Sequence, residues 1–235
     1  MDYKAFISRF KNKRILVIGD AMLDQHIQGS VSRISPEAPV PIVLQQGEPS
    51  FAPGGAANVA NNLRSLGAKV VLLAKVGRDH EGEIFIKGLK ERGISTTGIL
   101  VDHAPTILKT RIVAQHQQVL RLDREQIEKK VDPNFYKKVS KFLQNQVNNF
   151  DAVILSDYGK GMITPPLVEE VCALTRKYKK ILTVDPKVEH FAYYRRVTSI
   201  TPNRKEAENA IRNIKITQEG AHQLGINSDR LETLA

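Results

Sequence analysis

The chain has 235 residues, 41% of them hydrophobic, which is enough for one substantial core. Its formal net charge is +10, but the basic clusters are short and interleaved with acids, so we expect a solvated surface and no nucleic-acid partner. The single cysteine, Cys172, excludes an intramolecular disulfide and a thiolate metal cluster, and its apolar neighbours predict a buried helical thiol. No segment approaches the ~20 apolar residues that span a bilayer, and the N-terminus lacks a signal-peptide pattern, so we expect a cytoplasmic protein without membrane contact.

Five short apolar runs are typical of buried strands and lie at residues 14–19, 70–76, 152–156, 181–184 and 197–201. Helical patterns lie between them, and one of these spans 56–66 before Gly67 ends it. Strands that alternate with helices predict an α/β fold with three layers, in which helices cover both faces of a mainly parallel central sheet.

Two stretches interrupt this alternation. Residues 25–50 carry four prolines and no helical period, while residues 106–122 alternate as extended strands do. We predict that they form a small β-sheet beside the main sheet and act as a lid over a site; ordinary surface hairpins are the alternative. Because an exposed sheet edge invites pairing, we also predict a homodimer through this lid.

The segment "FAPGGAANVANNL", residues 51–63, places Gly54 and Gly55 directly before a helix. Unpaired N–H groups at a helix start, next to residues without a side chain, allow an oxygen-rich ligand to approach closely. Asn58 adds an amide in the first helical turn. The alternative interpretation is a tight turn that packs the helix on a strand.

Polar side chains follow four of the predicted strands. They are Asp20 and Asp24, Asp157 and Lys160, Asp185 and Lys187, and Asn203 and Glu206. In open parallel sheets the ligand binds beyond the carboxyl ends of the strands. Any one of these residues could cap a helix, but together they favour a site for hydroxyl groups, phosphate and Mg²⁺. The sequence contains no GxxxxGK[ST] motif, which excludes the P-loop class.

Several motifs carry a resemblance to the ribokinase-like carbohydrate kinases. "APGGAANVANNLRSLGAKVVLLAKVGRDHEG" resembles the first signature of that family, and "TPNRKEAE" resembles its Asn-x-x-Glu motif. More narrowly, "GDAMLDQHIQGSVSRISPEAPVPIV", "HQQVLRLDRE", "LSDYGKG" and "VDPK" resemble the heptose 7-phosphate kinases within it. The match covers nearly the whole chain, so we expect one ribokinase-like kinase domain over 1–235, with a ribokinase-like fold and lid.

The resemblance implies ATP-dependent phosphorylation of D-glycero-β-D-manno-heptose 7-phosphate at O1, with ATP and Mg²⁺ as cofactors. The 1,7-bisphosphate would serve the synthesis of ADP-heptose and the lipopolysaccharide core. A kinase for another sugar and a non-catalytic sugar-phosphate-binding fragment are the alternatives.

The resemblance also implies roles for individual residues. The sugar-binding candidates are Asp24, Gly54, Gly55, Asn58 and Asp157, and the candidates for the 7-phosphate are Arg33, Arg111 and Arg121. The candidates for the nucleotide phosphates are Asn203, Glu206, Lys160 and Lys187, with Glu206 also expected at the metal.

One family motif is absent from the sequence. The Gly-Ala-Gly-Asp that supplies the anion hole and the catalytic base in this family does not occur here. We therefore expect an incomplete kinase domain that is inactive alone, a base beyond Ala235, and a full gene in which a C-terminal adenylyltransferase domain is fused.

Overall fold

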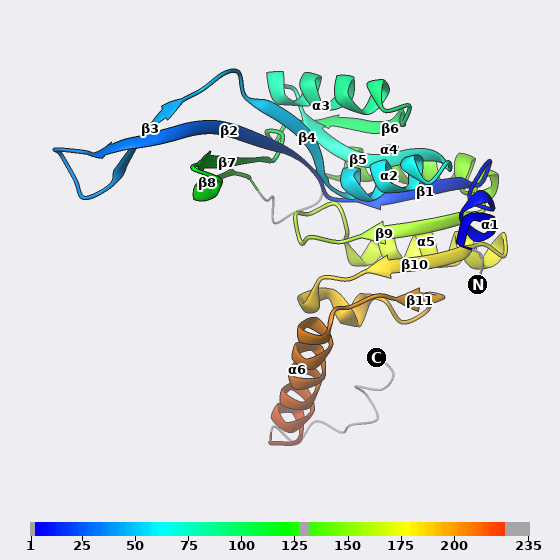
Figure 1. The fold of residues 1–235 in the computed structure, drawn as a ribbon. Helices are drawn as coiled ribbons and strands as arrows, with labels where there is room; N and C mark the ends of the chain where they lie inside the picture. The colour runs from blue at the N-terminus through cyan, green and yellow to red at the C-terminus, as the bar shows by residue number, and fades with distance from the viewer. Residues whose placement is uncertain (1–2, 127–131, 224–235) are drawn as a thin grey trace.

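The computed structural model describes residues 3–126 and 132–223, and its strands form two sheets (Figure 1). The larger sheet has six strands, and every pair of neighbours in it runs parallel. Their spatial order is β11 (Ser199–Ile200), β10 (Ile181–Asp185), β9 (Ala152–Ser156), β1 (Arg14–Gly19), β5 (Lys69–Gly77) and β6 (Ser95–Asp102). This confirms the predicted α/β class, although the last predicted strand, 197–201, is reduced to two paired residues.

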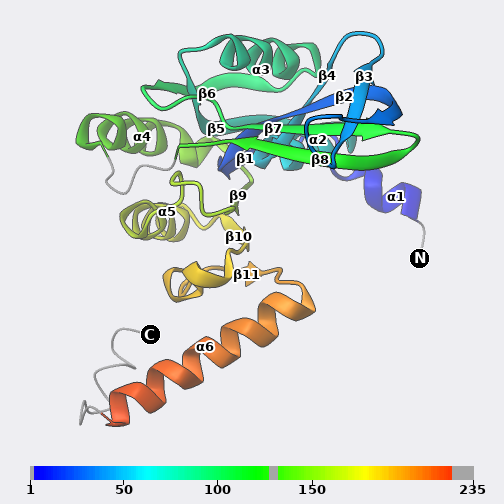
Figure 2. The same ribbon diagram turned by 90° about the vertical axis from the view of Figure 1, so that its left-hand side faces the viewer.

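Helices cover both faces of the larger sheet. One face carries α2 (Ala56–Ser65) and α3 (His80–Glu91), and the other carries α4 (Pro133–Gln146) and α5 (Pro165–Lys177), which Figure 2 shows end-on. The alternation of β1 explains this: Leu16 and Ile18 pack in the cluster built with α4 and α5, whereas Ile15 and Val17 pack in the cluster with α2 and α3. The predicted three layers are confirmed.

Local signals in the sequence set the ends of these helices. Asp79 and Asp132 cap α3 and α4 by accepting hydrogen bonds from first-turn N–H groups, at 2.9 Å in each case. Gly67 follows α2 with a φ of +96°, a conformation that a residue without Cβ adopts most easily. Cys172 lies in α5 and is buried, as predicted.

Four shorter or peripheral elements complete the chain. They are α1 (Tyr3–Ser8), the 3₁₀ helices η1 (Val147–Asn149) and η2 (Val188–Tyr193), and α6 (Arg204–Gln223). In Figures 1 and 2, α6 contacts the rest of the molecule near η2 and then projects away from the sheets. None of the helices in the described ranges combines the length and apolarity needed to cross a membrane.

The smaller sheet extends from the carboxyl end of β1. Its strands are β3 (Pro41–Gln45), β2 (Ala21–Ile34), β7 (Leu108–Ala114) and β8 (Gln117–Arg124), with β4 (Ser50–Gly55) paired to the first half of β2. Because β2 pairs with β7, the prediction that residues 25–50 and 106–122 share one small sheet is confirmed. The sheet begins earlier than expected, at Ala21, so Asp24 lies inside β2 and not in a loop after β1.

Candidate functional site

Three aspartates lie at the carboxyl edge of the central strands. The strand register places Gly19, Ser156 and Asp185 side by side on β1, β9 and β10. Asp20 and Asp157 therefore follow as neighbours at the same rim. This agrees with the predicted location of a ligand site in a parallel sheet.

Asp20 organises the loop that follows β9. Its carboxylate is buried and accepts three backbone N–H bonds, from Tyr158 at 2.9 Å, Lys160 at 3.0 Å and Met162 at 2.8 Å. Burial raises the pKa of the Asp20 carboxyl, and these three donors oppose that shift. The loop can wrap around one carboxylate because Gly159 and Gly161 adopt positive φ angles. The sequence indicated Asp20 as a rim residue but not this anchoring role.

Asp157, which we expected to bind the sugar, has both carboxylate oxygens occupied within the protein. Oδ1 accepts the Gly159 N–H at 2.7 Å, while Oδ2 contacts His190 Nδ1 at 2.6 Å and accepts the hydroxyl of Tyr194. Its side chain is fully buried. Burial, and then the hydrogen bond and charge of Asp157, raise the pKa of Tyr194. In this structure Asp157 therefore joins β9 to the segment after β10, a contact that sequence reasoning missed.

The two glycines before α2 are required by close approaches within the protein. A Cβ at Gly54 would lie 2.6 Å from Asp24 Oδ2, and one at Gly55 would lie 2.4 Å from the carbonyl oxygen of Asp20. Gly55 also has a positive φ of 57°. The tight-turn interpretation thus explains part of the motif, and it also places the Asp24 carboxylate directly against the bare backbone. Asn58 is exposed in the first turn of α2.

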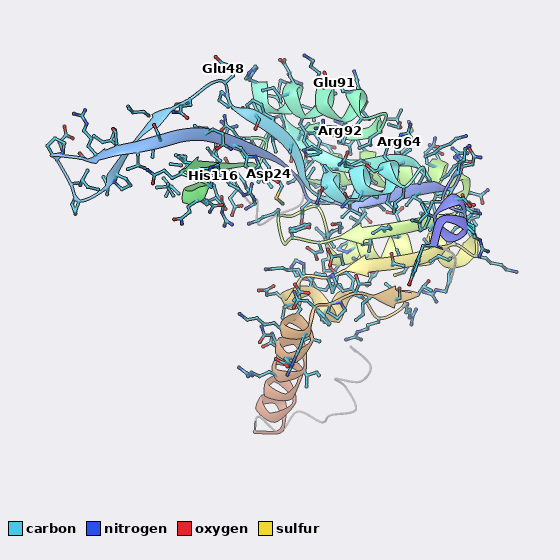
Figure 3. All side chains as sticks on the ribbon, viewed as in Figure 1. Asp24, Glu48, Arg64, Glu91, Arg92 and His116 are labelled. Atoms are coloured by element: carbon cyan, nitrogen blue, oxygen red, sulfur yellow. The ribbon has the colours of Figure 1, made fainter. Side chains whose placement is uncertain are left out.

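One face of the smaller sheet carries alternating charges, and we call it the charged face. Its residues are Asp24 on β2, Lys109 and Arg111 on β7, and Arg121 and Asp123 on β8. Asp24 Oδ1 contacts Arg111 Nη1 at 2.5 Å, and Arg121 lies directly opposite Arg111 in the antiparallel register. Arg121 and Lys109 form ion pairs with Asp123, at 3.0 Å and 2.9 Å. Figure 3 shows Asp24 where the smaller sheet leaves the main body.

Arg33, the third candidate for the sugar phosphate, lies far from these two arginines. It stands nine positions beyond Asp24 on β2, which corresponds to roughly 30 Å at about 3.3 Å per residue. Its side chain is exposed near the tip of the β2–β3 hairpin. Within one chain, the structure therefore does not bring Arg33 to Asp24.

Asn203 and Glu206 form a reciprocal capping box at the start of α6. Glu206 N–H donates to Asn203 Oδ1 at 2.9 Å, and Asn203 N–H donates to Glu206 Oε2 at 2.8 Å. The N-cap alternative noted for Asn203 is thus realised. Burial raises the pKa of the nearby Asp185 carboxyl, and the negative charges of Glu206 and Asp157 raise it further.

A magnesium ion fits this arrangement of carboxylates. The mutual repulsion of Asp185 and Glu206 would be relieved by a cation between them, and Mg²⁺ commonly takes one or two protein carboxylates while phosphate and water complete its shell. Among the described residues, no three potential metal-ligating side chains form a cluster, so the protein would supply at most two of the ligands. Asp185 was among the rim residues of the sequence analysis but was not expected at the metal.

Of the two lysine candidates, Lys160 lies in the loop after β9 and Lys187 lies beside it. Lys160 Nζ contacts Glu125 Oε2 at 2.7 Å. The Lys187 side chain packs against Gly159, so that a Cβ added to Gly159 would lie 3.4 Å from Lys187 Cγ. Tyr158 lies between the rim of the central sheet and the charged face. Burial raises the pKa of its hydroxyl, and the negative charges of Asp185, Asp24 and Asp20 raise it further. The carboxylates of the rim and Asp24 of the charged face therefore both act on Tyr158.

The chain combines a parallel sheet, whose strands end in polar residues, with a small sheet that projects beside those ends. The same combination is found in a family of sugar-phosphorylating enzymes. Residues 12–229 match the model of the pfkB family carbohydrate kinases. The chain belongs to that family.

Individual relatives agree with this assignment. The chain is 48% identical over 200 residues to the bifunctional protein HldE of Helicobacter pylori, covering 85% of this chain and 43% of that protein. It is 43% identical over 205 residues to HldE of Desulfatibacillum aliphaticivorans, covering 87% and 42%. The chain thus spans less than half the length of these curated relatives.

Solved structures show the same fold at low sequence identity. A carbohydrate kinase from Agrobacterium tumefaciens aligns with a TM-score of 0.63 at 21% identity, covering 84% of this chain and 63% of that one. The tetrameric inhibited form of phosphofructokinase-2 from Escherichia coli aligns with a TM-score of 0.64 at 15% identity, covering 90% and 70%. These similarities confirm the ribokinase-like fold.

Proposed function

We propose that this chain is the sugar-binding part of a kinase that transfers phosphate from ATP to O1 of D-glycero-β-D-manno-heptose 7-phosphate. The product would be the 1,7-bisphosphate used in ADP-heptose and lipopolysaccharide core synthesis. The observation that carries the proposal is the charged face, where a carboxylate and two arginines lie on adjacent strands beside the Gly-Gly turn. A sugar phosphate needs both kinds of group: acceptors for its hydroxyls and guanidinium donors for its phosphate.

In this proposal, Asp24 accepts hydrogen bonds from sugar hydroxyls, and the bare backbone at Gly54 and Gly55 allows the ring to approach. Asn58 contributes its amide from α2. Arg111 exchanges part of its contact with Asp24 for the 7-phosphate, and Arg121 joins it from the opposite strand. Both guanidinium groups are already held in place by carboxylates, so little side-chain freedom is lost on binding.

The nucleotide lies on the other side of Tyr158 in this proposal. Lys160 and Lys187 neutralise phosphate charge, while Asp185 and Glu206 hold Mg²⁺, which stabilises the transferred phosphoryl group when it is bound. Asn203 keeps α6 in place through its capping box. Asp20 anchors the loop between the two substrates, and Asp157, a sugar-binding candidate, joins that loop to the segment after β10.

The proposal is tested by measuring binding to the chain itself. Calorimetry should give a lower Kd for heptose 7-phosphate than for fructose 6-phosphate or ribose. Asp24→Asn should weaken sugar binding by about tenfold or more, or ~1.4 kcal/mol, and leave ATP affinity unchanged. Glu48→Gln, which removes an exposed carboxylate from the loop between β3 and β4, is the matched control. Equal affinity for the three sugars would contradict the proposed substrate, and unchanged binding by Asp24→Asn would contradict the site.

We further propose that the smaller sheet closes as a lid and also forms a homodimer contact. Its exposed large apolar side chains support this: Ile34, Val40, Leu44, Leu120 and Leu122 are each more than half exposed. In such a dimer Arg33 would act on the site of the partner subunit. Light scattering should give a dimer that Leu122→Asp converts to a monomer. A monomeric wild-type chain would refute this arrangement.

A further inference from the structure

A cavity of about 520 Å³ lies on the outer surface, between α5 and the segment that follows η2. Val168, Cys172 and Arg176 of α5 form one side of it, and Tyr193, Arg195 and Arg196 form the other. Val168 and Cys172 are buried at its floor, whereas the three arginines are exposed at its mouth. The cavity therefore combines an apolar base with a cationic rim.

In the described part of the chain, none of the three guanidinium groups forms an ion pair. Within the described part of the chain, none of Arg176, Arg195 and Arg196 lies within 4.0 Å of a carboxylate oxygen, and Glu169 is the one acid that lines the cavity. Three arginines without an ion-pair partner therefore gather positive charge around one cavity, and a bound anion would neutralise it.

The arginines act on the floor of the cavity as well as on its rim. Burial raises the pKa of the Cys172 thiol, while the positive charges of Arg176 and Arg196 oppose that shift. The guanidinium groups of Arg176 and Arg196 therefore lie close enough to Cys172 to lower the pKa of its thiol. Groups from α5 and from the segment after η2 converge on one space.

The cavity is connected to the rim of the central sheet through short contacts. The Tyr193 ring, which lines it, stacks on the His190 ring with centroids 4.7 Å apart and planes 19° apart. His190 Nδ1 contacts Asp157 Oδ2 at 2.6 Å, and the adjacent Tyr194 donates its hydroxyl to the same oxygen. A ligand that moves Tyr193 must therefore also disturb the partners of Asp157.

We propose that this cavity binds a phosphate-bearing small molecule, held by Arg176, Arg195 and Arg196, and that its occupancy changes the contact between His190 and Asp157. The site is separate from the charged face and does not depend on the proposed sugar substrate. Arginine forks match the oxygens of a phosphate, and the apolar floor accommodates an uncharged portion of the same ligand.

The test uses inorganic phosphate and pyrophosphate as probes and the ¹⁵N NMR spectrum of the whole chain as the readout. Both probes should shift the backbone amides of Ala173 and Ala192, which line the cavity, and pyrophosphate should also shift the imidazole nitrogens of His190. Arg195→Gln/Arg196→Gln should weaken the cavity response by about tenfold or more, because two of the three cationic groups are lost.

Two controls separate this site from other causes. Lys137→Gln/Lys138→Gln removes the same charge from exposed positions of α4 and should leave the cavity response unchanged. Ribose 5-phosphate and AMP, used in parallel, distinguish a free phosphate site from one for a larger ester. The proposal is overturned if Ala173 and Ala192 do not shift, or if the response is equal in both double variants. Shifts of these amides without any change at His190 would overturn the connection to Asp157.

Discussion

Replacing Asp20 by asparagine tests whether one buried carboxylate holds the loop after β9. In the native chain Oδ2 accepts two N–H bonds and Oδ1 accepts one. Asparagine can place its one acceptor oxygen where Oδ2 was and keep the bonds from Tyr158 and Lys160, but it then presents an NH₂ group to the Met162 N–H, so one hydrogen bond is lost. A hydrogen bond to a charged group contributes about 1.5–3 kcal/mol.

The expected loss lies near the lower limit of that range. The lost bond, together with the weakening of the two that remain on an uncharged acceptor, gives a decrease of about 2 kcal/mol in the free energy of unfolding, because removing a buried charge also removes its desolvation cost. For a chain of this size, 1 kcal/mol corresponds to ~2–4 °C, so the Tm should fall by roughly 4–8 °C. Amide hydrogen exchange at Tyr158, Lys160 and Met162 should accelerate in parallel.

Asp151→Asn is the matched control, because the exposed Asp151 carboxylate accepts a single backbone N–H bond, from Arg14 at 2.7 Å. It should cost less than about 1.5 kcal/mol. The reasoning is wrong if Asp20→Asn and Asp151→Asn lower the Tm equally, or if the three loop amides remain protected in Asp20→Asn.

Two further predictions concern the smaller sheet. Gly54→Ala should destabilise the chain by ~1–3 kcal/mol, because the new methyl group would lie 2.6 Å from Asp24 Oδ2. Gly47→Ala is the control and should cost less, because nothing lies within 4 Å of its new methyl group and only the φ of +73° opposes it. Equal denaturant midpoints for the two variants would refute this. The hydrogen bond from Lys109, followed by its charge, lowers the pKa of Asp123 below its usual 3.8. A carboxyl with a depressed folded-state pKa stabilises the fold above pH 3.8 and loses that contribution as the pH falls through the folded value, so Asp123→Asn should flatten the acid limb of stability in that window. An unchanged acid limb would contradict it.

The sequence was sufficient for the elements and for the site's general position. The strand at 152–156 was predicted with the bounds that the structure has, and the helix at 56–66 ends within one residue of α2. These features depend on hydrophobic periodicity and on glycine conformation, which act over a few neighbouring residues. The two segments of the smaller sheet were found by the same logic, although the start of β2 was not, because Ala21 to Asp24 continue directly from β1 after a single residue.

The sequence by itself therefore determined an α/β fold of the carbohydrate kinase family, with acids and lysines at the carboxyl edge of a parallel sheet. Only the tertiary structure decided which partners those groups have. Asp20 bonds to a loop 138 to 142 residues away, and Arg111 lies 87 residues from its partner Asp24. Such contacts are set by strand register and by the packing of layers, and a local pattern carries no information about either.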